Sequence, residues 1–353
     1  MAAEELLAEG ARDLDRRPSA LVLTGDQIYG DEVAGPLIGH LTRLGAELLG
    51  AGDTTSVPGV PALDRLVAYG RQELSHQLGF TSGKAGNHLF SLGEFAAMYL
   101  VAWDEANWPQ RLPDRAEALS AGRGSCLAAR QRRRYASELA DLEAARRALP
   151  AVRRVLANVP TYMIFDDHDV TDDWNLTREW HDQVWRSPGG RRVVANALAA
   201  YWAFQGWGNT PESFDEQFLA VVAAGPGDDR FDQTMWSFDR WSYHAPTDPP
   251  CWSWTPAPSG PSTASRAPHG CSATASWPAC ASSPARPASA APGRRSWCRR
   301  PRSTAWSSRS DARSSWSTRS GPTRSTSRPG TPTCRDCPTS CGCSSRSSGW
   351  TAA

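Results

Sequence analysis

Two short acidic segments contain the residues whose types and spacing could do chemistry. The first covers residues 24–31 (TGDQIYGD), and the second covers residues 166–175 (DDHDVTDDWN), where five Asp and one His lie within eight positions. Carboxylates a few ångströms apart repel one another strongly unless they bind a cation, share protons or stay solvated. Carboxylate oxygens with one imidazole suit Ca, Mn, Fe or Zn. These segments therefore indicate a metal site, and the alternative is an acidic turn that caps a helix.

Each acidic segment directly follows a short apolar run. Residues 20–24 (ALVLT) lead into Asp26, and residues 161–165 (TYMIF) lead into Asp166. Both runs are predicted to be buried β-strands. In open α/β sheets, ligands bind beyond the carboxyl ends of the strands. We therefore expect the two acidic loops to meet there, which favours a metal site over a capping turn.

The remaining pattern up to residue 250 is mainly helical. Residues 231–243 alternate between apolar and polar side chains and predict a half-exposed strand. A strand, a long helical excursion and a second strand are typical of an α/β sheet with helical insertions. Helical spacing, with a break expected at Pro150, predicts helices over residues 3–15, 32–50, 63–78, 90–106, 128–157, 191–206 and 212–223.

The charge and composition divide the chain at about residue 250. Residues 1–250 carry a net charge of −11, whereas residues 251–353 carry +12 from 14 Arg and two Asp. No run approaches the length of an apolar membrane span, so no membrane partner is expected. The chain begins with Met-Ala-Ala-Glu-Glu, without a basic start or an apolar signal core, so a cytoplasmic location is expected.

Residues 251–353 have a composition that cannot form a packed core. They contain no Leu, Ile, Val, Phe, Met or Tyr, but 25 Ser, seven Trp and eight Cys. Without aliphatic residues larger than Ala, burial cannot offset the entropy of ordering, so a disordered tail is expected. The alternatives are a low-complexity linker, an arginine-rich RNA-binding tail and a zinc site at Cys334 and Cys337.

A reading-frame error explains this composition better than any of those alternatives. GC-rich genes translated out of frame yield Ser, Arg, Pro, Ala, Thr, Gly, Cys and Trp. The correct frame is tested by joining the last base of each codon to the first two bases of the following codon. This shift converts the run CWSWTPAPSGPSTA to LVLDTRTQRAFDS, which is ordinary protein sequence. We therefore expect a frameshift near residues 249–251 and divide the chain into a partial domain, residues 1–250, and an out-of-frame tail.

The acidic loops resemble those of a known enzyme family. GDQIY and FDDHDVTDDWN are similar to the metal-binding loops of the alkaline phosphatase D family, a branch of the calcineurin-like metallophosphoesterases. The resemblance covers about residues 15–250 and includes the segment TSGKAGNHLFSLGEFAAMYLVAWDEANWP. It implies part of a calcineurin-like sandwich, in which helices flank a sheet. It also implies phosphate-ester substrates and two metal ions, Fe3+ with Ca2+, Zn2+ or Mn2+.

The resemblance also assigns roles to residues at matching positions. It makes Asp26 a metal-bridging ligand, Tyr29 a phenolate ligand to ferric iron and Asp167 a further metal ligand. His168 takes the place of the histidine that meets the substrate phosphate and assists the leaving group. Residues that could surround these ligands are Asp166, Asp169, Asp172, Asp173, Asn87 and His88.

Two parts of the family's site have no counterpart in this sequence. The family carries an early metal ligand on a preceding strand and histidines on a late loop, and neither pattern is seen. We therefore expect a truncated, frameshifted copy that is poorly active or inactive. The alternative function is a non-catalytic binding module whose arginine-rich tail binds nucleic acid, although a small phosphate ester is the favoured partner.

Overall fold

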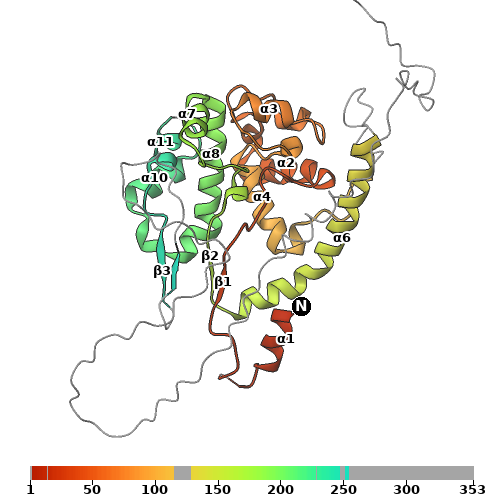
Figure 1. The fold of residues 1–353 in the computed structure, drawn as a ribbon, viewed down its shortest axis with the longest axis vertical. Coiled ribbons are helices and arrows are strands. Elements are labelled where there is room, and N and C mark those ends of the chain that lie inside the picture. The colour runs from red at the N-terminus through yellow and green to blue at the C-terminus, as the bar shows by residue number, and fades with distance from the viewer. Residues whose placement is uncertain (1, 14, 115–128, 228, 247–250, 254–353) are drawn as a thin grey trace, which may run out of the picture. The chain divides into compact units, whose positions relative to one another are not determined.

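A computed structural model describes residues 2–13, 15–114, 129–227, 229–246 and 251–253 (Figure 1). These residues belong to the first of two units, Met1–Ser272, and the second spans Ala273–Ala353. Of the tail, Cys251–Ser253 form a short strand, and the expectations for the rest of it, including disorder, a zinc site and nucleic-acid binding, lie outside the described residues. No helix among the described residues is long and apolar enough to cross a membrane.

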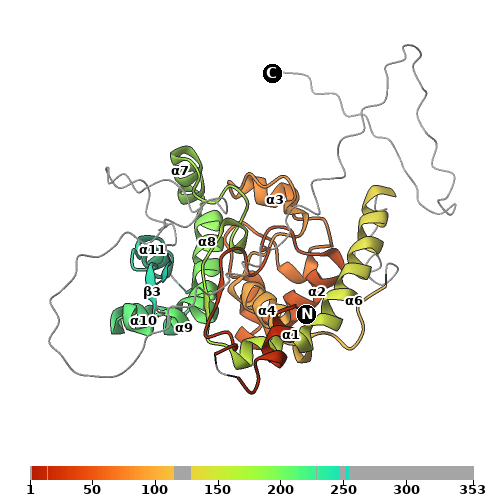
Figure 2. The ribbon, with the colours of Figure 1, turned by 60° about the horizontal axis from the view of Figure 1, so that its bottom comes forward.

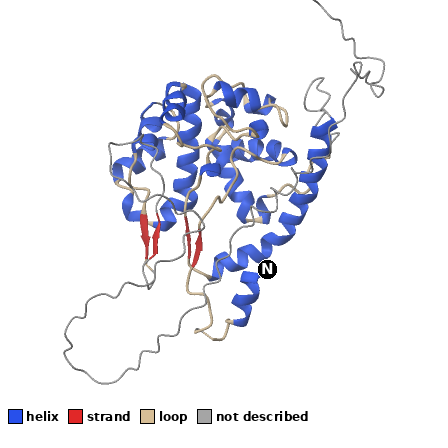
Figure 3. Ribbon diagram, viewed as in Figure 1, coloured by secondary structure: helices blue, strands red, loops and turns tan. Residues whose placement is uncertain are grey.

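The described part of the chain is mostly helical (Figure 3). A π-helical segment, η6 (Trp202–Gly206), joins α8 to α9, and short 3-10 turns connect several other helices. The α-helices are α1 (Ala2–Glu9), α2 (Gly35–Leu49), α3 (Gln72–Gln77), α4 (Leu92–Trp103), α6 (Ala129–Asn158), α7 (Arg178–Arg186), α8 (Pro188–Tyr201), α9 (Trp207–Asn209), α10 (Glu216–Ala224) and α11 (Asp229–Ser237).

Two small sheets accompany the helices. Strands β1 (Leu21–Leu23) and β2 (Thr161–Met163) pair in parallel, with Val22 opposite Tyr162. Strands β3 (Tyr243–Ala245) and β4 (Cys251–Ser253) pair antiparallel. The arrangement is therefore α/β in the broad sense, with a two-stranded parallel sheet among many helices. The side chains of β1 and β2 are half-buried rather than buried as predicted. Among the described residues this sheet has only these two strands, so each is an edge strand with no further strand beside it.

Several predicted elements differ from the structure. The helix predicted over residues 63–78 is divided into η2 (Leu63–Arg65) and α3, because Tyr69 adopts a left-handed conformation with a φ of 63°. The helix α7 was not predicted. Within residues 231–243, the structure has helix α11 followed by β3, because the buried Phe231, Met235 and Trp236 share one helical face.

The break expected at Pro150 is also wrong, because α6 continues through this residue. A proline inside a helix removes one backbone hydrogen bond and crowds the preceding turn. Helix α6 packs against α1, α2 and α4, and these contacts offset that cost. The remaining predicted helices are present; α1 ends at Glu9 instead of residue 15, and the other ends differ by a few residues.

The core forms where α4 lies between α2 and α8 (Figure 2). Helix α4 begins at Ser91, whose side chain accepts a hydrogen bond from the backbone of Glu94. Its buried residues include Phe95 and Tyr99. The α2–α4 crossing is close, since a β-carbon added to Gly45 would lie 2.5 Å from the carbonyl carbon of Gly93. Glycine is therefore required at this crossing by backbone proximity.

This proximity predicts opposite effects for two glycines of the same helix. Gly45→Ala is expected to lower the free energy of unfolding by about 1–3 kcal/mol, because the two helices must move apart. Gly39→Ala is the matched control, since a β-carbon there meets no atom within 4 Å. It should raise stability by about 0.5–1 kcal/mol through helix propensity. Urea unfolding of both variants measures the difference, and equal effects would contradict the close crossing.

Candidate metal centre

The loops that follow β1 and β2 are joined by direct hydrogen bonds. The backbone N–H of His168 donates to Oδ1 of Asp26 at 3.1 Å. The backbone N–H of Gly30 donates to the carbonyl oxygen of His168 at 2.7 Å. Parallel pairing places the carboxyl ends of both strands at the same edge of the sheet. The predicted meeting of the two acidic loops is therefore confirmed.

The second loop forms a tight turn whose own carboxylates stabilise it. The 3-10 turn η5 (Asp167–Asp169) follows Asp166, whose side chain accepts a hydrogen bond from the backbone of Asp167 at 3.0 Å. The carboxylate of Asp169 accepts in return from the backbone N–H of Asp166 at 3.1 Å. The Asp166 side chain also accepts from the backbone of Asp169, so Asp166 and Asp169 form a reciprocal capping box. Asp166 and Asp169 thus have the capping role considered as the alternative.

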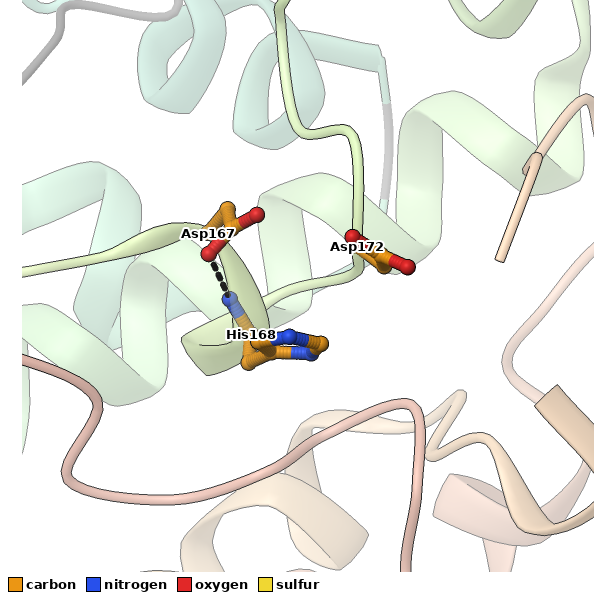
Figure 4. Close-up of side chains that lie close together, drawn as sticks. All are labelled: Asp167, His168 and Asp172. Atoms are coloured by element: carbon orange, nitrogen blue, oxygen red, sulfur yellow. Dashed lines mark hydrogen bonds between the residues drawn. The ribbon is translucent and has the colours of Figure 1, made fainter. Parts of the chain in front are cut away.

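The turn also gathers ligand atoms into two groups. In one group, single oxygens of Asp26, Asp166 and Asp167 all lie within 4.8 Å of one another. The second group joins Asp167, His168 and Asp172 at the same spacing (Figure 4). Asp167 belongs to both groups. Carboxylates and one imidazole at this spacing form a donor set suited to hard or borderline cations.

Crowding of the carboxylates changes their acidity. Burial, together with the nearby charge of Asp166, raises the pKa of Asp26 to about 6. Burial also raises the pKa of Asp167, and Asp166 adds to this effect. His168 opposes both shifts because it favours the ionised carboxylates. A bound cation would act in the same direction and relieve the repulsion.

Tyr29 lies beside these carboxylates. Its side chain forms a hydrogen bond with Asp26, which lowers the pKa of that carboxyl. Its ring centroid lies 4.7 Å from that of His168 with the planes tilted by 32°. The side chain is 43% exposed, so the phenol is accessible. The structure therefore places the expected ligand Tyr29 next to Asp26 and against one face of the histidine.

The imidazole of His168 contacts a buried carboxylate that sequence analysis did not select. Its Nδ1 lies 2.9 Å from Oδ1 of Asp31, which is 1% exposed. This hydrogen bond raises the pKa of His168 to about 9. Burial raises the pKa of Asp31, but the hydrogen bond and charge of His168, the charge of His88 and the backbone N–H of Asp172 together outweigh burial and lower that pKa to about 2. The available signal was its place as the last acid of TGDQIYGD.

Asp169 lies behind the turn rather than at its surface. Its Oδ1 accepts hydrogen bonds from the backbone N–H groups of Gln27 and Ile28, both at 3.2 Å. It also accepts from the hydroxyl of Tyr99 at 3.1 Å and from Nε2 of Gln205 at 3.4 Å. Burial raises the pKa of Asp169 to about 8. Asp169 therefore connects both loops to α4 and η6.

Asp173 and Asn87 lie outside the two ligand groups. Asp173 is exposed, has a φ of 65° and accepts a hydrogen bond from Oγ1 of Thr81 at 2.9 Å. The amide of Asn87 contacts backbone at both ends. It accepts from the N–H of Tyr69 at 2.6 Å and donates to the carbonyl of Val33 at 2.8 Å. Asn87 therefore links the backbone at Tyr69 to the backbone at Val33, which is a structural role.

His88 also lies outside the two groups and is fully buried. Its ring stacks between Phe80 and Phe90, with centroid distances of 4.8 and 5.5 Å. Its Nδ1 lies 2.6 Å from the carbonyl oxygen of Leu89. Burial lowers the pKa of His88, so its ring is neutral near neutral pH. His88 therefore acts as an aromatic core residue.

Comparison with known proteins finds no relative: no family model, curated protein or solved structure matches this chain.

Proposed function

We propose that this chain carries the metal site of a phosphoesterase of the alkaline phosphatase D type. The observation that supports the proposal is the convergence of Asp26, from the loop after β1, with Asp166 and Asp167, from the loop after β2. His168 adjoins these carboxylates and is about one quarter exposed. The resemblance of GDQIY and FDDHDVTDDWN to the family's loops gives the same grouping.

The residues present fit two cations that share Asp167, whereas the family resemblance makes Asp26 the shared ligand. Asp26, Asp166 and Asp167 would hold one ion, with Tyr29 beside them. Asp167 and Asp172 would supply oxygens to the other. Because carboxylates and a phenol dominate, the set suits Fe3+ with Ca2+, and it also suits Zn2+ or Mn2+. When bound, such ions polarise phosphoryl oxygens and lower the pKa of a bound water.

The chain's own residues would bind and orient the substrate. His168 offers an imidazole whose hydrogen bond to Asp31 favours the protonated form. A protonated imidazole contacts a phosphate oxygen favourably and can donate a proton to the departing alkoxide. The ring of Tyr29 packs against one face of the His168 imidazole and would limit its motion. The proposed substrates are soluble phosphate monoesters and diesters in the cytoplasm.

The fold belongs to the same proposal. Strands β1 and β2 would be two strands of a calcineurin-like sandwich. Further strands would be encoded in the original frame of residues 251–353, where the recovered string LDTRT extends the resemblance. Resequencing the gene around codon 250 tests this directly: an inserted or deleted base is expected, and an intact frame would contradict the frameshift.

Metal analysis of the purified full chain tests the proposed function. After dialysis against Fe3+ with Ca2+ or Mn2+, we expect bound metal in the wild type. We expect at least ~10-fold weaker binding in Asp167→Asn, because this substitution removes the shared ligand. Asp64→Asn, in an exposed position of η2, is the charge-matched control. Absence of bound metal in the wild type would refute the proposal.

Hydrolysis is a separate measurement from metal binding. We expect slow, metal-dependent cleavage of p-nitrophenyl phosphate or its bis(p-nitrophenyl) diester, since the family's flanking ligands have no counterpart in the sequence. The activity should disappear in Asp167→Asn and persist in Asp64→Asn. Activity that is independent of both added metal and Asp167 would show that another site, or a contaminant, hydrolyses the ester.

Tyr29 gives a spectroscopic prediction. A phenolate bound to ferric iron produces a visible charge-transfer band, so the Fe3+-loaded wild type should be coloured. Tyr29→Phe should remove the band while changing iron binding by less than ~10-fold, because the carboxylates remain. Tyr162→Phe, on β2, is the matched control and should keep the band. A band that survives Tyr29→Phe would exclude this tyrosine as the ligand.

A further inference from the structure

His88 is a titratable residue enclosed in the core. Its ring is fully buried and stacks between Phe80 and Phe90. Its Nδ1 lies 2.6 Å from the carbonyl oxygen of Leu89, and because a carbonyl can only accept, Nδ1 carries the hydrogen of the neutral ring. Nε2 is buried and has no hydrogen-bond partner among the described residues. A proton added at Nε2 would therefore enter the core without an acceptor, which is costly.

Charged groups from three parts of the chain face this ring, and each of them already has a partner. Asp31 and Glu94 favour the protonated ring, whereas Arg71 opposes it. Glu94 forms the buried ion pair with Arg71, and Asp31 accepts a hydrogen bond from Oγ of Ser82. Burial therefore has the largest effect and lowers the pKa of His88 below its ordinary value.

The segment around His88 holds the end of the first acidic loop. Hydrogen bonds join residues 82–89 to residues 30–33. The N–H of Leu89 donates to the carbonyl oxygen of Gly30 at 2.7 Å, Nδ2 of Asn87 donates to the carbonyl oxygen of Val33 at 2.8 Å, and Oγ of Ser82 donates to Oδ2 of Asp31 at 2.8 Å. Because His88 lies between Asn87 and Leu89, its ring cannot leave the core without disturbing these hydrogen bonds.

We propose that His88 is an acid-sensitive latch, whose protonation releases residues 82–89 from residues 30–33 and loosens the loop that carries Asp26 and Tyr29. The latch is closed while the ring is neutral, because the closed state offers Nε2–H no acceptor. It opens in acid, because water then receives this hydrogen. The inference needs neither a metal nor a substrate, so it stands or falls independently of the proposed function.

The direction of the pH effect follows from the two states. The pKa of His88 in the closed state lies below the ordinary value of 6.5, so the open state binds the proton more strongly. Opening therefore becomes more favourable as the pH falls below 6.5, until the pKa of the closed state is reached. Within that range, the equilibrium constant for opening should rise by up to ~10-fold per pH unit.

Amide hydrogen exchange of the metal-free full chain tests the latch. Protection factors, which correct for the intrinsic pH dependence of exchange, would be measured from about pH 8 to about pH 5. The N–H of Leu89 should lose up to ~10-fold in protection per pH unit below the ordinary histidine pKa. N–H groups in the middle of α8 should lose much less. An equal loss in α8 would show global unfolding and would overturn the latch.

His88→Phe is the matched variant, since a third phenylalanine ring fills the same stack and does not titrate. Protection of the Leu89 N–H in this variant should lose most of its pH dependence. His76→Gln removes an exposed histidine of α3 and should keep the wild-type response. A pH-dependent loss that persists in His88→Phe would assign the titration to another group and overturn the proposal.

A direct titration of the wild type needs no folded variant. With nitrogen-15-labelled histidine, nuclear magnetic resonance identifies the His88 ring through its proximity to the protons of Phe80 and Phe90. The ring should remain neutral at pH 6.5, with its hydrogen on Nδ1. A His88 ring that is already protonated at this pH in the folded protein would overturn the proposal, because the closed state would then hold the charge.

Discussion

Replacing Arg71 by Met is expected to lower the free energy of unfolding by about 3–5 kcal/mol. Arg71 and Glu94 form a buried two-point ion pair, with Nη1 2.8 Å from Oε2 and Nη2 2.7 Å from Oε1. The side chains are 1% and 0% exposed. Without Arg71, the carboxylate of Glu94 would remain in the core without its counter-charge, and this desolvation is the source of the expected loss.

Urea unfolding of three further variants tests that explanation. Arg71→Met combined with Glu94→Gln should recover part of the loss, because the unpaired charge is gone while an amide oxygen still accepts hydrogen bonds. Arg43→Met is the surface control, since Arg43 and Glu47 are both about two-thirds exposed. It should cost less than about 1 kcal/mol. A double variant no more stable than Arg71→Met would contradict the charge-based explanation.

The effect should depend on pH in a defined direction. Burial raises the pKa of Glu94, but Arg71 outweighs burial and holds that pKa below its ordinary value. The pair therefore stabilises the wild type above about pH 4.5 and loses this effect as pH falls through the folded pKa. In Arg71→Met the hydrogen bonds from Thr42 and the backbone of Phe90 remain, but burial is no longer opposed by a positive charge, so protonation of Glu94 should restore stability as the solution becomes acidic. The difference between the two proteins should narrow at low pH.

The same ion pair supports the candidate site. Nη1 of Arg71 also donates to the carbonyl oxygen of His88 at 2.8 Å, and Oε2 of Glu94 accepts from the backbone N–H of Phe90 at 3.0 Å. Between them, the N–H of Leu89 donates to the carbonyl oxygen of Gly30 at 2.7 Å. Gly30 directly precedes Asp31. Loss of the pair should therefore disturb the Asp31–His168 contact as well as stability.

The convergence of the two acidic loops was predictable because it depends on local signals. Each loop follows a run of strand-forming residues, and parallel pairing places the loops at one edge. Asp26 and Asp167 could therefore be grouped although 141 positions separate them in the sequence. The helical character of residues 32–50 and 90–106 was equally predictable, since α2 and α4 keep a helical spacing of buried residues.

Other features depend on partners that no local pattern identifies. Asp31 and Asp172 belong to different acidic loops, and burial of Asp31 by Ser82 and the backbone of Asp172 distinguishes it from a solvated acid. Asp169 follows His168 directly, yet contacts with Tyr99 and Gln205 turn it toward the core. The pattern of residues 231–243 fits both periods over a short range, and tertiary burial selects the helix.

Asp26→Asn is expected to stabilise the metal-free protein by about 1–2 kcal/mol while strongly weakening its response to metal. The carboxylate of Asp26 is destabilised by burial and by Asp166, which together raise its pKa from 3.8 to about 6. A folded pKa above the unfolded value means that ionisation costs stability near neutral pH, and that this cost is relieved as pH falls below about 6. An amide at this position can still accept the hydrogen bond from the backbone of His168.

The response to metal should have the opposite sign. Cations that bind the folded wild type at 100 times the dissociation constant should add about 2.7 kcal/mol of stability. Asp26→Asn should gain far less, since one ligand of the group with Asp166 and Asp167 is gone. Thermal unfolding with and without Ca2+ or Mn2+ measures both effects, and Asp64→Asn should match the wild type. A metal-free Asp26→Asn protein less stable than the wild type, with an undiminished metal response, would show that these carboxylates neither repel one another nor share a cation.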